Sequence, residues 1–384
     1  MHRSPWVESV MGDALAALPS LATGSFRRKS AASAQVHAGT GRQPAATPQP
    51  DTTLTQHRNN ACPPVRPGRC AQRCPTAGAL RCYDRCWLPF ASRPSTPTVT
   101  AQTPEFQLPP FATLEALGPA QVAEAMVACF ARLGARPDRL ENAHALALRS
   151  IGLAATEPLA LAGQAIARDI DHGVGAGVAN GYHNPQHFLE VMLSALYLAR
   201  LARLDARRSA RVVTAGLIHD FHHDGSRGSS AQFRLELLAW QKAEPYLRRA
   251  AVDAEMCDGL EALVLATEPR AGATYARACW KHLCGAGPAA HRGANLPPQI
   301  ERLSADSELA ADAVLLAEAD VLPSIGLTLA HADTLQARLA AEWGTMFGHE
   351  DKLQFIDRMV SETVVSRFFI PNVQRLRHSY ARDA

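Results

Sequence analysis

The sequence lacks the features that would assign it to several large classes of protein. No apolar stretch approaches the roughly 20 residues that a membrane-spanning helix needs. The first residues lack the basic-then-apolar pattern of a secretory signal. The formal net charge of the 384 residues is only +3, which gives no electrostatic argument for nucleic acid or a membrane as a partner. We therefore expect a soluble cytoplasmic protein with no nucleic-acid or membrane partner.

Cysteine usage argues against a disulfide framework. The nine cysteines are an odd number in a long chain, whereas disulfide-stapled domains are short and carry paired cysteines. Five lie between Cys62 and Cys86, where the spacings Cys70-x3-Cys74 and Cys82-x3-Cys86 fall in the range that zinc sites use. No helix or strand pattern surrounds these cysteines to present the thiolates, so a zinc site is the minor alternative.

Residues 1–105 differ in composition from the rest of the chain. They hold 13 of the 26 prolines and carry 12 Lys and Arg against 5 Asp and Glu, so their local charge is +7 and that of the remainder is −4. Such a segment cannot bury enough apolar surface to offset the entropy of ordering it. We predict that residues 1–105 are disordered. The alternative is that translation begins downstream and that this segment is incidental.

The sequence after residue 105 has the pattern of helices. Leu, Ala and Val recur at helical spacing with few strand-like alternations, which predicts one all-α domain over residues 106–384. Pro245 and Pro323 are expected to end or kink their helices, and the Gly and Pro cluster of 285–298 predicts a surface loop. The predicted helices cover residues 119–134, 138–152, 158–172, 184–203, 207–222, 231–249, 252–267, 306–330, 333–346 and 350–378.

Two histidines lie at the predicted start of one helix. His183 and His187 are four residues apart, a spacing that puts both on one helix face. Pro185 suits the first helical turn, where its missing N–H costs nothing, and Asn184 suits the N-cap position. A cleft can reach a helix start, so the pair is a candidate metal or catalytic site. Two surface histidines are the alternative.

A second polar group lies where an apolar helix runs into six residues that begin at His219, of which five are titratable. Burying such groups without partners costs several kcal/mol each, and a metal removes that penalty. His223 lies four residues beyond His219, on the same face of a continued helix, and Gly225 then lets the chain turn. A solvated helix end is the alternative, but Asp220 and Asp224 are acids at the end where the dipole favours cations.

A third candidate is Asp320, which is surrounded by apolar residues just before the expected break at Pro323. A carboxylate there needs a partner, either a metal or a core Arg or Lys. The three groups together supply two imidazoles and two carboxylates, a set that suits zinc, iron or manganese at a tight site. A second site of carboxylate and water suits magnesium or manganese. Paired metals stabilise the entering and leaving oxygens of a phosphoryl displacement, which predicts a metal-dependent phosphohydrolase.

The order and spacing of these groups resemble the catalytic domain of the class I 3′,5′-cyclic nucleotide phosphodiesterases. These belong to the all-helical HD superfamily of metal-dependent phosphohydrolases. The two main motifs are HNxxH, which starts at His183, and HDxxHxG, which starts at His219. The segments Leu265–Thr267, Ala319–Asp320 and Phe355–Asp357 resemble the family's LAT, AD and FID elements, so that the resemblance spans roughly residues 180–360.

The resemblance implies a role for each residue of the predicted metal centre. The first of two divalent metal ions would be held by His187, His219, Asp220 and Asp320, and Asp220 would bridge to the second. Metals in such a site would lower the pKa of a shared water, and the hydroxide would attack phosphorus in line. His183 would be the general acid that protonates the leaving sugar oxygen.

The resemblance also implies which residues surround the reacting groups. Tyr182, Lys352 and Phe355 would contact the substrate, a small phosphodiester. His223 and Glu236 would orient the water and its neighbours from the next layer of residues.

The sequence departs from the family pattern at three places. Gly228 stands where the family has Asn or Gln, no paired histidines occur near Glu244–Arg249, and Lys352 replaces the glutamine that grips the purine. If Lys352 points into the site, its three donors favour an acceptor or a negative charge on the substrate; otherwise Gln354 lies nearest the base. The predicted function is a cyclic-nucleotide phosphodiesterase. The alternatives are an HD-type nucleotide phosphomonoesterase, which HNxxH disfavours, and a non-catalytic nucleotide or metal sensor.

Overall fold

The computed structural model describes residues 116–175, 180–226, 231–291, 293, 295–363 and 366–382, and these contain helices but no strand. The all-α prediction is therefore confirmed. Residues 1–105, with their cysteine cluster, and Gly228 lie outside the described residues. The helices are α3 (Pro119–Gly134), α4 (Arg139–Ser150), α5 (Pro158–Asp171), α6 (Pro185–Leu201), α7 (Ala206–Ile218), α8 (Arg234–Arg249), α9 (Ala254–Leu265), α10 (Gly272–Leu283), η2 (Pro298–Ser304), α11 (Ser307–Ile325), α12 (Leu329–Glu342), α13 (His349–Glu362), η3 (Arg367–Phe369) and α14 (Ile370–Arg382).

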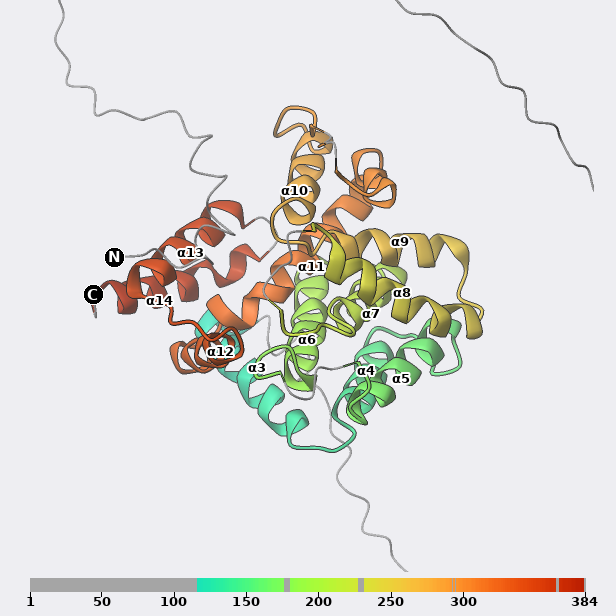
Figure 1. Cartoon of the computed structure of the whole chain (residues 1–384), viewed down its shortest axis with the longest axis horizontal. Helices are drawn as coiled ribbons and strands as arrows, with labels where there is room; N and C mark the ends of the chain where they lie inside the picture. Colours follow the sequence, from blue (N-terminus) through green and yellow to red (C-terminus); the bar gives the residue numbers. More distant parts are fainter. Residues whose placement is uncertain are drawn as a thin grey trace, which may run out of the picture. The chain divides into compact units, whose positions relative to one another are not determined.

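Two helices, α6 and α11, form the centre of the fold. Every residue of α6 from His187 to Ala199 is buried, and α11 is buried over most of its length. Helices that are apolar on all sides belong inside a domain. α6 packs against α7, α11, α4 and α3, and Figure 1 shows it amid these neighbours. No single described helix is long and apolar enough to cross a membrane, and only α11 and α12 joined, at 100° to each other, pass such a test.

An ion-pair cluster fixes α7 against α11. Asp312 of α11 is fully buried, and its carboxylate accepts hydrogen bonds from Arg208 at 2.7 Å and from Arg211 at 2.5 Å, both on α7. A buried carboxylate is tolerated when it is paired and hydrogen-bonded. The cluster therefore sets how the first turns of α7 meet α11.

The last helices build a separate apolar cluster beside the main core. It joins the end of α11 to α12, α13 and α14. Its buried members are Ile325, Ala332, Ile356, Met359, Val373, Leu376 and Tyr380. This cluster holds α12 and α13 in place, and both helices line the cavity described below.

Pro245 and Pro323 were expected to end or kink their helices, and neither proline ends its helix. α8 continues through Pro245 to Arg249, and α11 continues through Pro323 to Ile325. Proline removes one helical hydrogen bond, but the turns beyond the two prolines bury Leu247 and Ile325, respectively. Burial of these side chains offsets the lost bond.

Other boundaries differ by a few residues or by a whole element. α3 covers residues 119–134 as predicted, whereas the predicted helix 350–378 is divided into α13 and α14 with η3 between them. α10 and η2 were not predicted. α10 begins at Gly272, and its apolar residues keep a helical period, but most of them are small and basic residues separate them, so the apolar content of the segment is low.

Candidate active site

The first histidine motif lies at the start of α6. The side chain of Asn184 accepts hydrogen bonds from the backbone N–H groups of Gln186 and His187, and Pro185 is in the first turn. These are the capping roles that the sequence indicated. The prediction that His183 and His187 share one helix face is wrong, however, because His183 precedes the helix. Its side chain reaches the site from the loop before α6.

The second motif lies in a turn after α7. The helix ends at Ile218, and His219 is its C-cap. The backbone of His222 is left-handed at φ 67°, and the buried Phe221 anchors this turn in the core. The prediction that His223 continues the helix face of His219 is therefore wrong, because a left-handed residue interrupts the helix between them.

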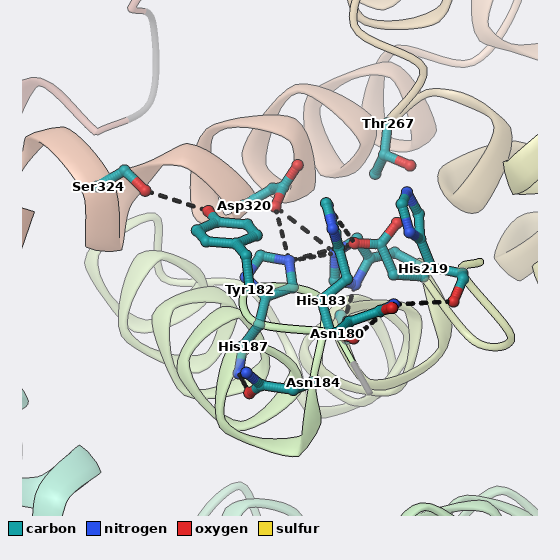
Figure 2. A network of polar contacts seen from close by, with 12 residues as sticks. Asn180, Tyr182, His183, Asn184, His187, His219, Thr267, Asp320 and Ser324 are labelled. Carbon is teal, nitrogen blue, oxygen red and sulfur yellow. Dashed lines mark hydrogen bonds and ion pairs between the residues drawn. The ribbon is translucent and has the colours of Figure 1, made fainter. Parts of the chain in front are cut away.

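Asp320 projects from the interior of α11 rather than from a helix end, because the helix continues to Ile325. Candidate metal-binding side chains from a turn and from two buried helices thus meet at one point. Figure 2 shows His183, His187 and His219 converging below α11, from which Asp320 points toward them.

Four donor atoms form a compact cluster. The Nε2 atom of His187 lies 3.3 Å from Nε2 of His219 and 3.2 Å from Oδ2 of Asp220. Oδ2 of Asp220 lies 3.1 Å from Nε2 of His219. Oδ1 of Asp320 is 3.5 Å from each of the two imidazole nitrogens. We call His187, His219, Asp220 and Asp320 the donor cluster.

The donor cluster fits a divalent transition metal. Tetrahedral ligands with bonds of about 2.0–2.1 Å lie about 3.3–3.4 Å apart, close to the separations within the cluster. Nδ1 of His219 donates to the carbonyl of Gly216 at 2.9 Å, so the lone pair of its Nε2 can face the other donors. Two imidazole nitrogens and two carboxylates are a donor set that zinc, iron and manganese accept.

Charge within the donor cluster shifts its protonation. Burial lowers the pKa of His219, but the carboxylates of Asp220 and Asp320 outweigh burial and raise it well above its ordinary value. Burial raises the pKa of Asp220, but His219 and His187 outweigh burial and hold it well below the ordinary value. Without a metal, the proton held by His219 thus balances the negative charge of the carboxylates in the donor cluster. Binding a metal would release a proton, which makes affinity fall at low pH.

Glu342, at the end of α12, holds the His183 segment and was not foreseen. Its carboxylate accepts from Nδ1 of His183 at 2.5 Å and from the backbone N–H groups of Tyr182 and His183 at 2.6 and 3.0 Å. Burial raises the pKa of Glu342, but the hydrogen bonds from His183 and the two backbone N–H groups outweigh burial and lower it. Glu342 is 159 residues away from His183, and no local pattern pointed to it.

The His183 ring is held with its Nε2 atom toward the donor cluster. Because Nδ1 donates to Glu342, the other nitrogen faces Asp220, whose Oδ2 lies 4.0 Å away. The ring of His223 stacks on that of His183, with centroids 3.7 Å apart and planes inclined by 16°. Nδ1 of His223 accepts from the N–H of Gly225, and burial lowers the pKa of His223 to about 4. His223 is therefore a neutral neighbour of His183 at neutral pH.

A cavity of about 490 Å³ opens beside the donor cluster. This volume is in the range of small-molecule sites. Part of its lining is polar and includes Tyr182, His183, Asp220, His223, Glu236 and Asp320. Another part is apolar and includes Leu335, Leu339, Trp343, Phe347 and Phe355. The cavity thus has a polar region beside the donor cluster and an apolar wall that an aromatic ring of a ligand could contact.

Two predicted residues of the polar lining have perturbed protonation. Burial is the main cause that raises the pKa of Glu236 to about 8, and the nearby charges of Glu268 and Asp220 add to it. Burial also raises the pKa of Tyr182, whose hydroxyl hydrogen-bonds to Ser324 at 3.2 Å. Both groups therefore favour their neutral, protonated forms.

Lys352 lies on the cavity wall, but other groups hold its ammonium. Nζ lies 3.6 Å from Oδ1 of Asp333 and 4.6 Å from the centre of the Tyr380 ring. Gln354 is not among the described residues that line the cavity, and its amide donates to Glu350. The charge of Lys352 is thus balanced within the protein, and Gln354 does not take the place of the family's glutamine.

The sequence matches no protein-family model and no curated protein. Among solved structures, the chain is similar to LmjPDEB1 in complex with IBMX, with TM-score 0.48 and 14% identity over 65% of this chain and 88% of that one. It is also similar to the phosphodiesterase domain of Salpingoeca rosetta rhodopsin phosphodiesterase, with TM-score 0.47 and 16% identity over 64% and 88%.

Proposed function

We propose that this protein is a metal-dependent phosphodiesterase that hydrolyses a 3′,5′-cyclic nucleotide or a related small phosphodiester. One observation carries the proposal: an imidazole that is oriented by a carboxylate, His183 with Glu342, faces the metal-type donor cluster across 4.0 Å. A site that only binds a metal has no use for a proton donor aimed at it. A hydrolase that breaks a P–O ester bond needs both.

The donor cluster would hold the first of two divalent metals, zinc, iron or manganese, and Asp220 would reach the second, magnesium or manganese. Such metals lower the pKa of water and neutralise charge on phosphoryl oxygens. The remaining functions belong to protein side chains. Burial of the donor cluster excludes bulk water from its inner side, since His187 and His219 are 3% and 1% exposed.

His183 acts as the general acid. The Glu342 carboxylate accepts a hydrogen bond from Nδ1 of His183, which holds the proton on that nitrogen and fixes the ring. The proton on Nε2 therefore points toward the cavity. The proton moves from Nε2 to the leaving oxygen as the P–O bond breaks. The neutral His223 ring stacks on His183 without opposing its positive charge.

The apolar part of the cavity lining receives the base. Phe355 and Leu339 offer flat and branched apolar surfaces beside the polar region. Aromatic stacking tolerates different bases, because every base has a π-face. A nucleotide-sized substrate therefore suits the cavity, and stacking on this wall does not select one base.

One assay tests this proposal against its two alternatives. The purified protein is incubated with manganese and with cyclic AMP, cyclic GMP, bis(4-nitrophenyl) phosphate or nucleoside 5′-monophosphates. We expect hydrolysis of at least one diester and loss of it on chelation. Hydrolysis of the monophosphates alone would favour a phosphomonoesterase, and binding of metal without hydrolysis would favour a sensor.

A further inference from the structure

Asn180 connects the two loops that carry His183 and His223. Its side-chain amide lies between them and donates to the carbonyl of His183 at 3.3 Å and to the carbonyl of His223 at 3.2 Å. Figure 2 shows Asn180 beneath His183, with dashed lines on both sides of its amide. The two loops are distant in the sequence, 43 residues apart between Asn180 and His223. One amide group thus joins them directly.

The two carbonyls determine which end of the amide faces them. Both partners are acceptors only, so the NH₂ group must face them and the amide oxygen must turn away. A primary amide has two N–H donors, one for each carbonyl. A carboxylate of the same shape has none and would repel both carbonyl oxygens.

Gly225 provides the space that this arrangement needs. Its backbone is left-handed at φ 72°, and a Cβ atom there would lie 2.6 Å from the amide oxygen of Asn180. The N–H of Gly225 also donates to Nδ1 of His223. Gly225 therefore makes room for the Asn180 side chain and directs the His223 ring at the same time.

The consequence for the reaction lies in the stacked pair of rings. His183 is fixed at its Nδ1 and backbone N–H by Glu342, and at its carbonyl by Asn180. His223 is fixed at its ring by Gly225 and at its carbonyl by Asn180. Among the described residues, the Asn180 side chain donates a hydrogen bond to the backbone of each, so it helps to set how the two rings lie against each other at 3.7 Å.

We propose that Asn180 is a positioning residue for proton donation: by holding the loops of His183 and His223 together, it aims Nε2 of His183 at the leaving oxygen. This inference rests on the proposed phosphodiesterase function. In the step concerned, a water oxygen forms a new P–O bond, the P–O bond to the leaving group breaks, and the proton on Nε2 passes to the leaving oxygen. Asn180 forms its two hydrogen bonds outside the donor cluster, so it does not hold the metal.

The dependence of the rate on the leaving group tests this role. A sugar alkoxide must be protonated as it leaves, whereas 4-nitrophenolate is stable enough to leave without a proton. Asn180→Asp should lower kcat for a cyclic nucleotide by about 10²-fold, the cost expected when a reacting group is misplaced by an ångström. It should change kcat for bis(4-nitrophenyl) phosphate by less than about threefold, and KM for the cyclic nucleotide should change little.

Two further measurements and one control accompany the comparison. Bound metal should stay equal to that of the unmodified protein, and the melting temperature shows whether the variant is folded. The matched control is Asn142→Ala, at a half-buried asparagine of α4, for which both rates should be unchanged. If Asn180→Asp does not fold, Asn180→Ser retains one donor and should give a smaller loss with the same leaving-group dependence.

The outcomes separate this inference from the proposed function. If the unmodified protein cleaves both diesters and the Asn180 variants slow both equally, lose metal or slow neither, the inference is wrong and the phosphodiesterase proposal stands. If the unmodified protein cleaves neither diester, the proposed function fails, and the inference fails with it.

Discussion

His183 and Asp220 lie 4.0 Å apart, yet their substitutions should have different effects. Asp220→Ala removes a carboxylate from the donor cluster, so we expect loss of both metal and activity. His183→Ala removes only the proton donor, so metal should remain while the rate falls by about 10²–10⁴-fold. Metal analysis and kcat on the same samples measure both effects. Loss of metal in His183→Ala would show that His183 is a ligand.

Glu236 gives a pH-dependent prediction at the same scale. Its pKa is about 8 in the folded protein because of burial, against 4.5 in the unfolded chain. The folded state therefore binds more protons between these values, and the contribution of Glu236 to stability falls as pH rises from 4.5 to about 8. In metal-free protein, Glu236→Gln should raise the melting temperature increasingly over this window and level off above it. A melting-temperature difference that does not depend on pH would contradict the assigned cause.

Two residues of α13 that line the cavity, Phe355 and Lys352, should contribute differently to substrate binding. Phe355 lines the cavity, and its replacement by alanine should raise KM for a cyclic nucleotide by about 5–150-fold, equivalent to about 1–3 kcal/mol of lost stacking. Lys352→Gln should change KM by less than about threefold, because Asp333 and Tyr380 already hold the ammonium. A large improvement for cyclic AMP or cyclic GMP in Lys352→Gln would show that the lysine discriminates against purines.

The packing of α7 on α11 provides a stability prediction. Asp312→Ala would leave the largely covered guanidinium groups of Arg208 and Arg211 without this carboxylate, and we expect a loss of about 3 kcal/mol in the free energy of unfolding. The control is Asp258→Ala, which removes an ion pair with Arg302 whose side chains are 52% and 42% exposed. Its cost should stay below about 1 kcal/mol. Denaturant unfolding of both variants measures the difference. Similar losses of unfolding free energy in the two variants would show that the ion-pair cluster at Asp312 stabilises the fold no more than a surface pair does.

For the whole molecule, we predict that residues 1–105 are dispensable. Their composition cannot support a packed core, and a segment of this kind can be removed without exposing buried surface. A chain that begins near residue 106 should remain soluble and keep the kcat of the full-length protein. Aggregation of the truncated protein, or a large fall in kcat, would show that the segment packs on the domain or assists the reaction.

Local patterns in the sequence were sufficient for most of the helices and for the cap at the start of α6. The apolar period predicts α6 and α11 as helices, and Asn184 and Pro185 mark the start of α6 because capping depends on neighbouring residues only. The histidine and aspartate motifs made these residues candidates, and the resemblance to a known family implied which of them would form the donor cluster. Such features are encoded within a few residues, so one sequence is enough to recognise them.

Tertiary structure alone decided the contacts between distant segments. Glu342 holds His183 across 159 residues, and Asp333 with Tyr380 takes up the charge of Lys352. The left-handed turn at His222, which moves His223 off the helix, depends on packing of Phe221 in the core. Packing between helices depends on how whole surfaces fit together. For this reason the sequence identified the histidines and aspartates of the site, while the folded chain added Glu342 and Asn180 and determined how each group is aimed.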